Sequence, residues 1–398
     1  MDKKKILVAY YEMFLGGSTT SLLAFLNCID KTKYDVDLQL YHNSGELFED
    51  IPEGVNVLPD AAMHKGKWGF VVKNLKGIFS GKLLKAYLVN KKRKKKGFSG
   101  QILADLQAEV LARKSRVYYD YAIGFMEGWP DRYIASRVKA RKKIGWLHNT
   151  FANLAAIPEL ELPWMEKVDK LIFVADNCTE DFKKAMPEMA HKAETVLNIT
   201  DSEIIRAKAE KECGDDVDFL RFCRADCFKI ITVCRLSMYH KGLDRIVWCA
   251  KEMKEAGEDF LWYIVGSGRD EEKLQKMIVE NDVADRVVLI GARFNPHPFI
   301  KAADIMCMPS RYEGKPITVT ESMILGTPPV VTEYLSAHEQ IESGIEGIVV
   351  PNQDDTIVAP LKEMMDDPSV FRNMQQILLQ REYGNSKNSV QLEKILFV

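Results

Sequence analysis

The sequence lacks any run of 18 uninterrupted apolar residues, which argues against an ordinary membrane-spanning helix. Lysines precede an apolar stretch at the N-terminus, but Glu12 interrupts that stretch and no small-residue cleavage site follows, which disfavours a signal peptide. The eight cysteines are scattered through apolar segments without the spacing of a disulfide framework, so we expect a reducing compartment. Together these absences indicate a cytoplasmic protein.

A clear metal-ligand pattern is also missing. Cys213, Cys223 and Cys227 form the only cysteine cluster, and no fourth ligand stands at a recognisable spacing. Asp35 and Asp37 form a D-x-D pair, but they lie at the start of a predicted strand and not at its ligand-facing end. We therefore expect no metal and no cofactor.

Acidic residues are absent from residues 61–104, a segment that contains twelve lysines and arginines although the whole chain has a net charge of −2. Such a basic block is commonly a solvated face or a loop. Apolar residues between the lysines instead favour contact with an anionic membrane surface, such as the inner face of the cytoplasmic membrane. Nucleic acid is the weakest interpretation because no nucleic-acid-binding motif accompanies the block, and we expect no such partner.

The 398 residues, 46% of them hydrophobic and 28% charged, are enough for two globular domains. Strand-like and helix-like segments alternate in both halves, which predicts two α/β domains with parallel sheets and helices on both faces. We expect domains at 1–198 and 229–375, a linker at 199–228, and a C-terminal helical segment at 376–398 that packs back toward the first domain. Ligands of such sheets bind beyond the carboxyl ends of the strands.

The stretch EGKPITVTE carries two glutamates eight positions apart. Proline is favoured at the first helical position and glycine after the last, so we predict a helix from about Pro316 to Gly326. Glu313 then lies in the loop before the helix and Glu321 in its second turn. The free N–H groups and the dipole of a helix N-terminus attract anions, so both carboxylates are expected near an anionic ligand.

Two cations belong to the same half of the chain. Arg235 follows a predicted strand and Lys241 precedes a predicted helix, an arrangement that suits a diphosphate. The loop that contains Arg293 follows the third strand of this half, and its backbone groups are expected to meet a base. Cations, a helix N-terminus and a more distant carboxylate for a ribose together predict a site for a nucleotide diphosphate.

Several of these segments resemble those of the family 4, or group 1, glycosyltransferases of the GT-B type, among them bacterial surface-polysaccharide glycosyltransferases. The resemblance implies two Rossmann-like domains that face each other across a cleft, and a retaining, metal-independent hexosyltransferase. The segments are GGSTTSLL (16–23), GWLHN (145–149), CRLSMYHKGLD (234–244), YIVGSG (263–268), IGARFNP (290–296) and SRYEGKPITVTESMILGTPPVV (310–331). The last of them contains the E-x7-E motif of the family.

The resemblance also implies roles for particular residues. Glu321 would hold the ribose hydroxyls of a sugar nucleotide, Glu313 would contact the donor sugar, and Arg235 and Lys241 would hold the diphosphate. Backbone groups at the start of the helix would assist them, at Gly314, Lys315, Pro316 and Ile317.

Gly17 and His148 belong to the other domain. Gly17 would let the first loop approach the diphosphate or the acceptor closely, and His148 would touch the donor sugar. His148 follows an apolar strand, however, and a core histidine is the alternative for it.

The expected reaction transfers a sugar from a nucleotide-diphosphate sugar, a UDP-sugar by preference, to a glycan or lipid-linked acceptor in surface polysaccharide biosynthesis. Two alternatives are a non-catalytic, glycan-binding partner subunit of a transferase and a sugar-nucleotide epimerase on the same scaffold.

Overall fold

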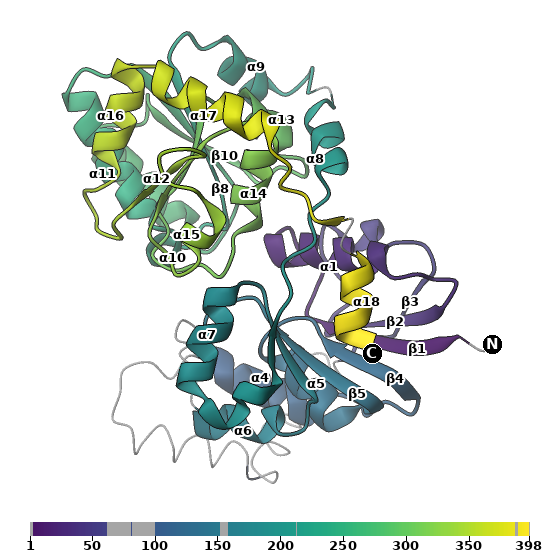
Figure 1. Ribbon diagram of the computed structural model, residues 1–398. Helices are drawn as coiled ribbons and strands as arrows, with labels where there is room; N and C mark the ends of the chain where they lie inside the picture. The colour runs from purple at the N-terminus through teal and green to yellow at the C-terminus, as the bar shows by residue number, and fades with distance from the viewer. Residues whose placement is uncertain are drawn as a thin grey trace. The chain divides into compact units, whose positions relative to one another are not determined.

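The computed structural model describes residues 3–61, 81, 100–151, 158–211, 213–386 and 389–397. The chain divides into two compact units, of which unit 1 comprises Met1–Leu197 with Asn388–Val398 and unit 2 comprises Asn198–Lys387 (Figure 1). Most of the basic block at 61–104, and with it the expected membrane surface, lies outside the described residues. No helix in the described ranges has the length and apolar character needed to cross a membrane.

Unit 1 contains a parallel sheet of seven strands in the order β3-β2-β1-β4-β5-β6-β7. The strands are β1 (Lys4–Tyr10), β2 (Tyr34–Leu40), β3 (Val55–Val57), β4 (Tyr118–Gly124), β5 (Lys139–Leu147), β6 (Lys170–Phe173) and β7 (Ala193–Thr195). The helices are α1 (Gly17–Cys28), α4 (Gly100–Leu111), α5 (Trp129–Arg137), α6 (Pro158–Met165), α7 (Asp176–Ala185) and α18 (Ser389–Phe397), with short 3₁₀ turns at Phe48–Asp50 and Pro187–Lys192. The last five residues of β1 are all buried, as expected of a strand that helices cover on both faces.

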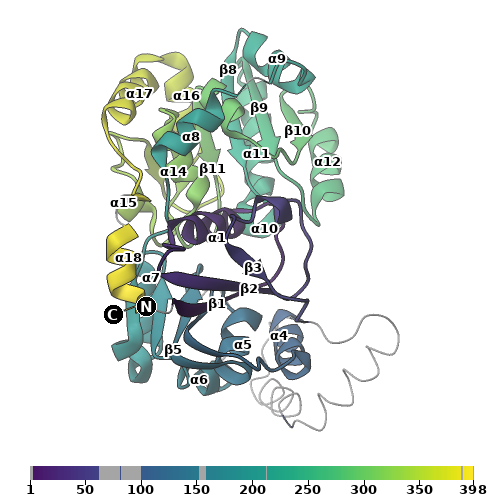
Figure 2. The ribbon, with the colours of Figure 1, turned by 90° about the vertical axis from the view of Figure 1, so that its right-hand side faces the viewer.

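The C-terminal helix α18 packs on unit 1, where it lies beside the sheet in Figures 1 and 2. The Phe397 ring lies 4.9 Å from the Tyr34 ring and 4.6 Å from the Tyr121 ring, between centroids. The Tyr121 hydroxyl also donates a hydrogen bond of 2.6 Å to the Phe397 carbonyl. The chain thus returns to unit 1 at about residue 388, later than the expected boundary at 376, because α17 (Ser369–Gln380) still packs on unit 2.

Unit 2 contains a parallel sheet of six strands in the order β10-β9-β8-β11-β12-β13. The strands are β8 (Phe228–Val233), β9 (Phe260–Val265), β10 (Val287–Gly291), β11 (Ile305–Met308), β12 (Pro329–Thr332) and β13 (Ile348–Val350). The remaining helices of this unit are α8 (Ser202–Ala209), α9 (Val217–Arg224), α10 (Met238–Lys241), α11 (Leu243–Glu255), α12 (Glu271–Glu280), α13 (His297–Ala302), α14 (Ile317–Ile324), α15 (Ala337–Gln340) and α16 (Val358–Asp366).

Both sheets reverse their strand order once. In unit 1 the reversal falls between β1 and β4, and in unit 2 it falls between β8 and β11. Open α/β sheets bind ligands in the crevice at the carboxyl ends of the two strands on either side of such a reversal. In unit 2 those two ends lead directly to Arg235 and to Glu313.

The expected linker at 199–228 differs from the structure, which has helices α8 and α9 in this stretch and assigns both to unit 2. The side chains of Asp201 and Asp216 cap the two helices by accepting backbone hydrogen bonds. Phe222 is fully buried and stacks on Tyr263, with ring centroids 4.5 Å apart. The loose sequence pattern conceals these elements because each helix is only eight residues long and buries few side chains.

Candidate functional site

Glu313 lies in the loop after β11 and is buried, with 8% of its side chain exposed. Lys241 Nζ and Ser310 Oγ each lie 2.6 Å from the same carboxylate oxygen, Glu313 Oε1. The other oxygen, Oε2, accepts no hydrogen bond from the residues that the structure describes. The loop therefore holds a carboxylate by one oxygen and leaves the other for a ligand.

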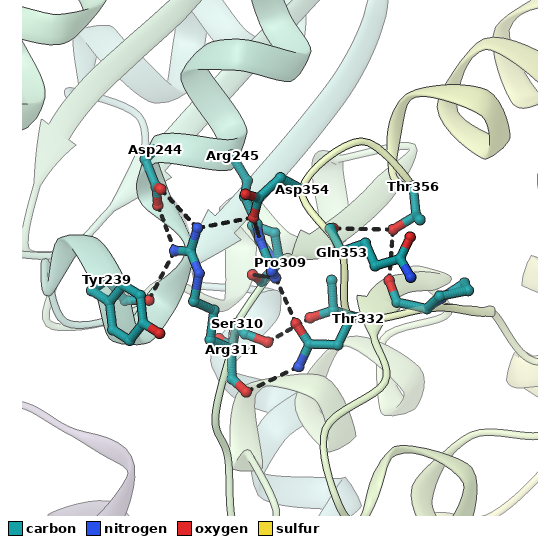
Figure 3. Close-up of polar contacts among 12 residues, drawn as sticks. Tyr239, Asp244, Arg245, Pro309, Ser310, Arg311, Thr332, Gln353, Asp354 and Thr356 are labelled. Carbon is teal, nitrogen blue, oxygen red and sulfur yellow. Dashed lines mark hydrogen bonds and ion pairs between the residues drawn. The ribbon is translucent and has the colours of Figure 1, made fainter.

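Three consecutive carbonyl oxygens hold this loop in place, those of residues 309–311 (Figure 3). Their hydrogen-bond donors are Arg245 on α11, Thr332 on β12 and Asn352 after β13, at 3.1, 2.6 and 3.0 Å respectively. Each donor comes from a different element, so the core of unit 2 sets the path of the loop. Such support from packed elements is what fixes the geometry of a site.

Arg311 stabilises the same loop from outside. Its guanidinium forms two hydrogen bonds of 2.8 Å with Asp244 and one of 3.0 Å with Asp354 (Figure 3). It also lies over the Tyr239 ring, 4.7 Å from the centroid. These contacts occupy the Arg311 side chain, so we assign it a structural role.

Helix α14 begins at Ile317, one residue later than predicted, and Pro316 is its N-cap with φ −66° and ψ 121°. Leu325 is the C-cap, and Gly326 follows with φ +77°, a left-handed conformation that favours glycine. Glu321 is in the second turn, as predicted. The sequence signals for this helix were therefore correct to within about two residues.

Two carbonyl groups of the backbone just before α14 accept hydrogen bonds from side chains at α15. Ser336 Oγ donates to the Gly314 carbonyl, and Gln340 Nε2 donates to the Pro316 carbonyl at 3.0 Å. The N–H groups of Gly314, Lys315 and Ile317, by contrast, meet no hydrogen-bond acceptor in the described part of the chain. Free N–H groups at a helix start form a site for an anion.

The Lys315 side chain, unlike its backbone N–H, already has a partner. Its Nζ lies 2.9 Å from Glu339 Oε1 on α15, and both side chains are largely buried, with 16% and 19% exposed. Only the backbone of Lys315 is thus available near the helix start, in line with the expectation that backbone groups contribute there.

Glu321 is buried and lies 3.3 Å from His297 Nε2, measured from Glu321 Oε1. The pair is not aligned as a hydrogen bond, and His297 Nε2 has no hydrogen-bond partner among the described residues. On the other side of the ring, His297 Nδ1 lies 2.7 Å from Asn295 Oδ1. No sequence motif marks His297, which stands 24 positions before Glu321 on a different helix.

Arg235 follows β8 and is exposed, and its side chain forms no hydrogen bond or ion pair with the described residues. The loop that carries it packs against the loop after β9, where Leu236 N donates to Ser267 O at 2.9 Å. At Gly266 a β-carbon would overlap the Cys234 carbonyl, and φ there is +149°. The GSG stretch is therefore a close backbone approach that leaves the Arg235 side chain available to a ligand.

Cys234, at the start of this loop, is not a candidate nucleophile. Burial raises the pKa of its thiol to about 12, so the thiol stays protonated at neutral pH. The described residues contain no group of three or more metal-ligating side chains.

Arg293 has structural partners in place of the expected ligand. Its guanidinium lies 3.0 Å from Asp216 and 2.6 Å from Asp218, at the start of α9. It also donates to the Ile290 carbonyl. These bonds connect α9 to the loop after β10, and we leave the Arg293 side chain out of the proposed site.

In unit 1, Gly17 is the first residue of α1, directly after the loop that follows β1. Gly16 is the N-cap, and no side chain caps the helix. The Ser18 and Thr19 hydroxyls instead contact Tyr10 Oη, at 2.8 and 3.2 Å. The start of α1 thus keeps its backbone N–H groups uncapped by any side chain.

His148 follows β5, and its ring packs on Phe125 with centroids 5.2 Å apart. Glu127 Oε2 accepts a 2.8 Å hydrogen bond from the His148 backbone N–H, and Glu127 Oε1 accepts another from the Asn149 side chain. Burial lowers the pKa of His148, although the nearby Glu127 carboxylate opposes this shift. The ring is therefore neutral at neutral pH, and its Nε2 has no hydrogen-bond partner in the described ranges.

Comparison with known proteins finds a family match within unit 2. Residues 224–380 match the family of glycosyl transferases group 1. This range covers most of unit 2 and contains Arg235, Lys241, Glu313 and Glu321.

Two glycosyltransferases are similar in sequence to part of this chain. An alpha-D-kanosaminyltransferase of Streptomyces kanamyceticus is 28% identical over 191 residues, which cover 47% of this chain and 46% of the relative. The amylovoran biosynthesis glycosyltransferase AmsK of Erwinia amylovora is 32% identical over 143 residues, which cover 33% of this chain and 34% of the relative. The matched stretches therefore span less than half of these relatives' own length.

Solved structures match the whole chain. HepE of Anabaena, in complex with UDP and glucose, covers 99% of both chains with a TM-score of 0.68 and 17% identity. WaaG, a glycosyltransferase involved in lipopolysaccharide biosynthesis, covers 98% of this chain and 99% of its own with a TM-score of 0.67 and 13% identity. The fold is the predicted GT-B arrangement of two Rossmann-like units.

Proposed function

We propose that this chain is a glycosyltransferase that moves a sugar from a UDP-sugar to a glycan or lipid-linked acceptor in surface polysaccharide biosynthesis. The observation that carries the proposal is the Glu313 carboxylate, which Lys241 and Ser310 hold by one oxygen at the strand-order reversal of unit 2. A relative named for amylovoran biosynthesis and a similar structure that contains UDP support the acceptor class and the donor.

The proposed donor site lies in unit 2. The diphosphate would be held by Arg235, Lys241 and the free N–H groups at the start of α14. Glu321 would hold the ribose, and Glu313 Oε2 would accept a hydrogen bond from a hydroxyl of the sugar. The cations and N–H groups would stabilise the charge that develops on the departing diphosphate. This arrangement supports catalysis without a metal.

We further propose retention of configuration. The bond between the sugar C1 and the diphosphate oxygen breaks while the acceptor oxygen bonds to C1 on the same face. The proton of the acceptor hydroxyl passes to the departing phosphate oxygen, so that no protein base is required. In unit 1, His148, which is neutral, would touch the donor sugar, and Gly17 would let the loop after β1 approach the diphosphate or the acceptor closely.

A thermal-shift panel of UDP-, GDP-, ADP- and dTDP-sugars tests the donor. A ligand at 100 times its dissociation constant stabilises by about 2.7 kcal/mol, and we expect this for the UDP-sugar. Glu321→Ala should weaken UDP binding and Glu313→Ala should mainly lower turnover, whereas Glu280→Ala, on the exposed face of α12, is the control. Equal loss of UDP affinity in the first two variants would contradict the division of roles.

Transfer assays test the chemistry. Turnover should persist in excess EDTA, and its loss with rescue by manganese or magnesium would contradict metal independence. Binding of a UDP-sugar without any transfer would favour the non-catalytic subunit, and a changed sugar without an acceptor would favour the epimerase. The anomeric configuration of the product decides between retention and inversion.

The acceptor proposal depends on the basic block at 61–104, where each lysine or arginine near an anionic surface contributes about 1 kcal/mol to membrane binding. We expect the protein to sediment with anionic vesicles, to dissociate as salt rises, and to ignore neutral vesicles. Changing the six basic residues at 91–96 to glutamine should abolish this binding. The acceptor proposal would be contradicted if the protein did not bind vesicles and transferred sugar to soluble acceptors equally well with and without these charges.

A further inference from the structure

A chain of polar side chains leads from α8 to Glu321 inside unit 2. Asn295 Nδ2 donates a 2.7 Å hydrogen bond to the Lys208 carbonyl, and Asn295 Oδ1 lies 2.7 Å from His297 Nδ1. His297 Nε2 lies 3.3 Å from Glu321 Oε1. His297 and Glu321 are 5% and 6% exposed, so water does little to screen their interaction.

These contacts determine which ring nitrogen carries a proton. Because the Asn295 amide group donates to Lys208, its oxygen faces His297, and His297 Nδ1 must therefore be the N–H donor. The opposite edge of the ring then places Nε2 3.3 Å from Glu321 Oε1, so the ring covers that carboxylate oxygen.

We propose that His297 is a positioning residue for Glu321, and this proposal rests on the proposed function. The His297 ring lies against Oε1, and Oε2 remains to accept hydrogen bonds from the ribose hydroxyls. Glu313 follows the same rule, because Lys241 and Ser310 both bind its Oε1 and leave its Oε2. Each glutamate of the pair is thus oriented by one oxygen and faces its ligand with the other.

Two substitutions of His297 test its two ring nitrogens one at a time. In His297→Gln the amide nitrogen replaces Nε2 and keeps a donor toward Glu321. In His297→Asn the shorter amide keeps a donor toward Asn295 but does not reach Glu321. The probes are UDP and its 2′,3′-dideoxy analogue, which lacks the ribose hydroxyls, and isothermal titration measures the affinity of both.

We expect wild-type protein to prefer UDP over the dideoxy analogue. His297→Asn should lose about tenfold in UDP affinity, the equivalent of one hydrogen bond to a charged group, and should keep its affinity for the analogue. His297→Gln should stay close to wild type with both probes. In wild-type protein with ¹⁵N-labelled histidine, UDP should shift the His297 Nε2 resonance and the analogue should not, a measurement that needs no variant to fold.

Three results would overturn the inference. Wild-type affinity of His297→Asn for both probes, with the preference for UDP intact, would refute the role of His297 alone. An equal loss for both probes would show a structural effect only. Failure of wild-type protein to bind any nucleoside diphosphate would refute the proposed function, and this inference with it.

Discussion

Removal of the Lys241 charge should destabilise unit 2 and stop transfer, and the two effects can be separated. In Lys241→Met the Glu313 carboxylate stays buried with only the Ser310 hydroxyl as a partner. At 2.6 Å and an effective dielectric constant of 20, Coulomb's law gives about 6 kcal/mol for the ion pair. Desolvation offsets part of this, and loss of one partner from a buried pair costs about 3–5 kcal/mol.

The double variant Lys241→Met with Glu313→Gln removes both charges and should recover most of this loss, because no unpaired charge remains. For a unit of this size, 3–5 kcal/mol corresponds to a fall of roughly 10 °C in the unfolding midpoint. Lys254→Met is the control, since its ion pair with Asp285 lies at the surface, where solvent screens it. Calorimetry measures the midpoints, and a donor-consumption assay measures turnover.

Turnover should stay low in the double variant even where stability returns, because both groups of the proposed site are gone. Additive losses of stability in the two single variants would refute the coupling between Lys241 and Glu313. Recovery of turnover together with stability would show that the pair serves the fold and not the reaction.

Three further predictions follow from other residues. Arg235→Ala should lower turnover roughly 100-fold without changing the unfolding midpoint, because its side chain is exposed and serves only the ligand; a lowered midpoint would contradict this. Gly242→Ala should reduce both stability and turnover, since φ is +62° there and a β-carbon would overlap the Pro309 carbonyl, whereas Gly257→Ala, with φ +85° and open space, should cost only about 1 kcal/mol. Burial raises the pKa of Asp131 well above its usual range, so its contribution to stability is complete below about pH 4 and declines as pH rises. Denaturant unfolding between pH 4 and pH 8 should therefore show Asp131→Asn gaining at least about 1 kcal/mol on wild type at the upper end, and parallel curves would contradict this.

The sequence by itself determined the alternation of strands and helices, the helix that begins near Pro316, and the position of Glu313 and Glu321 relative to it. These features depend on signals within a few residues, because proline, glycine and hydrophobic period act locally. The short helices α8 and α9 escaped prediction, since their burial depends on partners such as Tyr263 that lie far along the chain.

Only the tertiary structure decided how the site residues are held. The pairing of Lys241 with Glu313 joins residues 72 positions apart, and the contact of His297 with Glu321 joins two different helices. Arg293 seemed equally suited to a ligand, but Asp216 and Asp218 neutralise it. A side chain's charge and type can be read from the sequence, whereas its partners depend on which strand ends the sheet order places side by side.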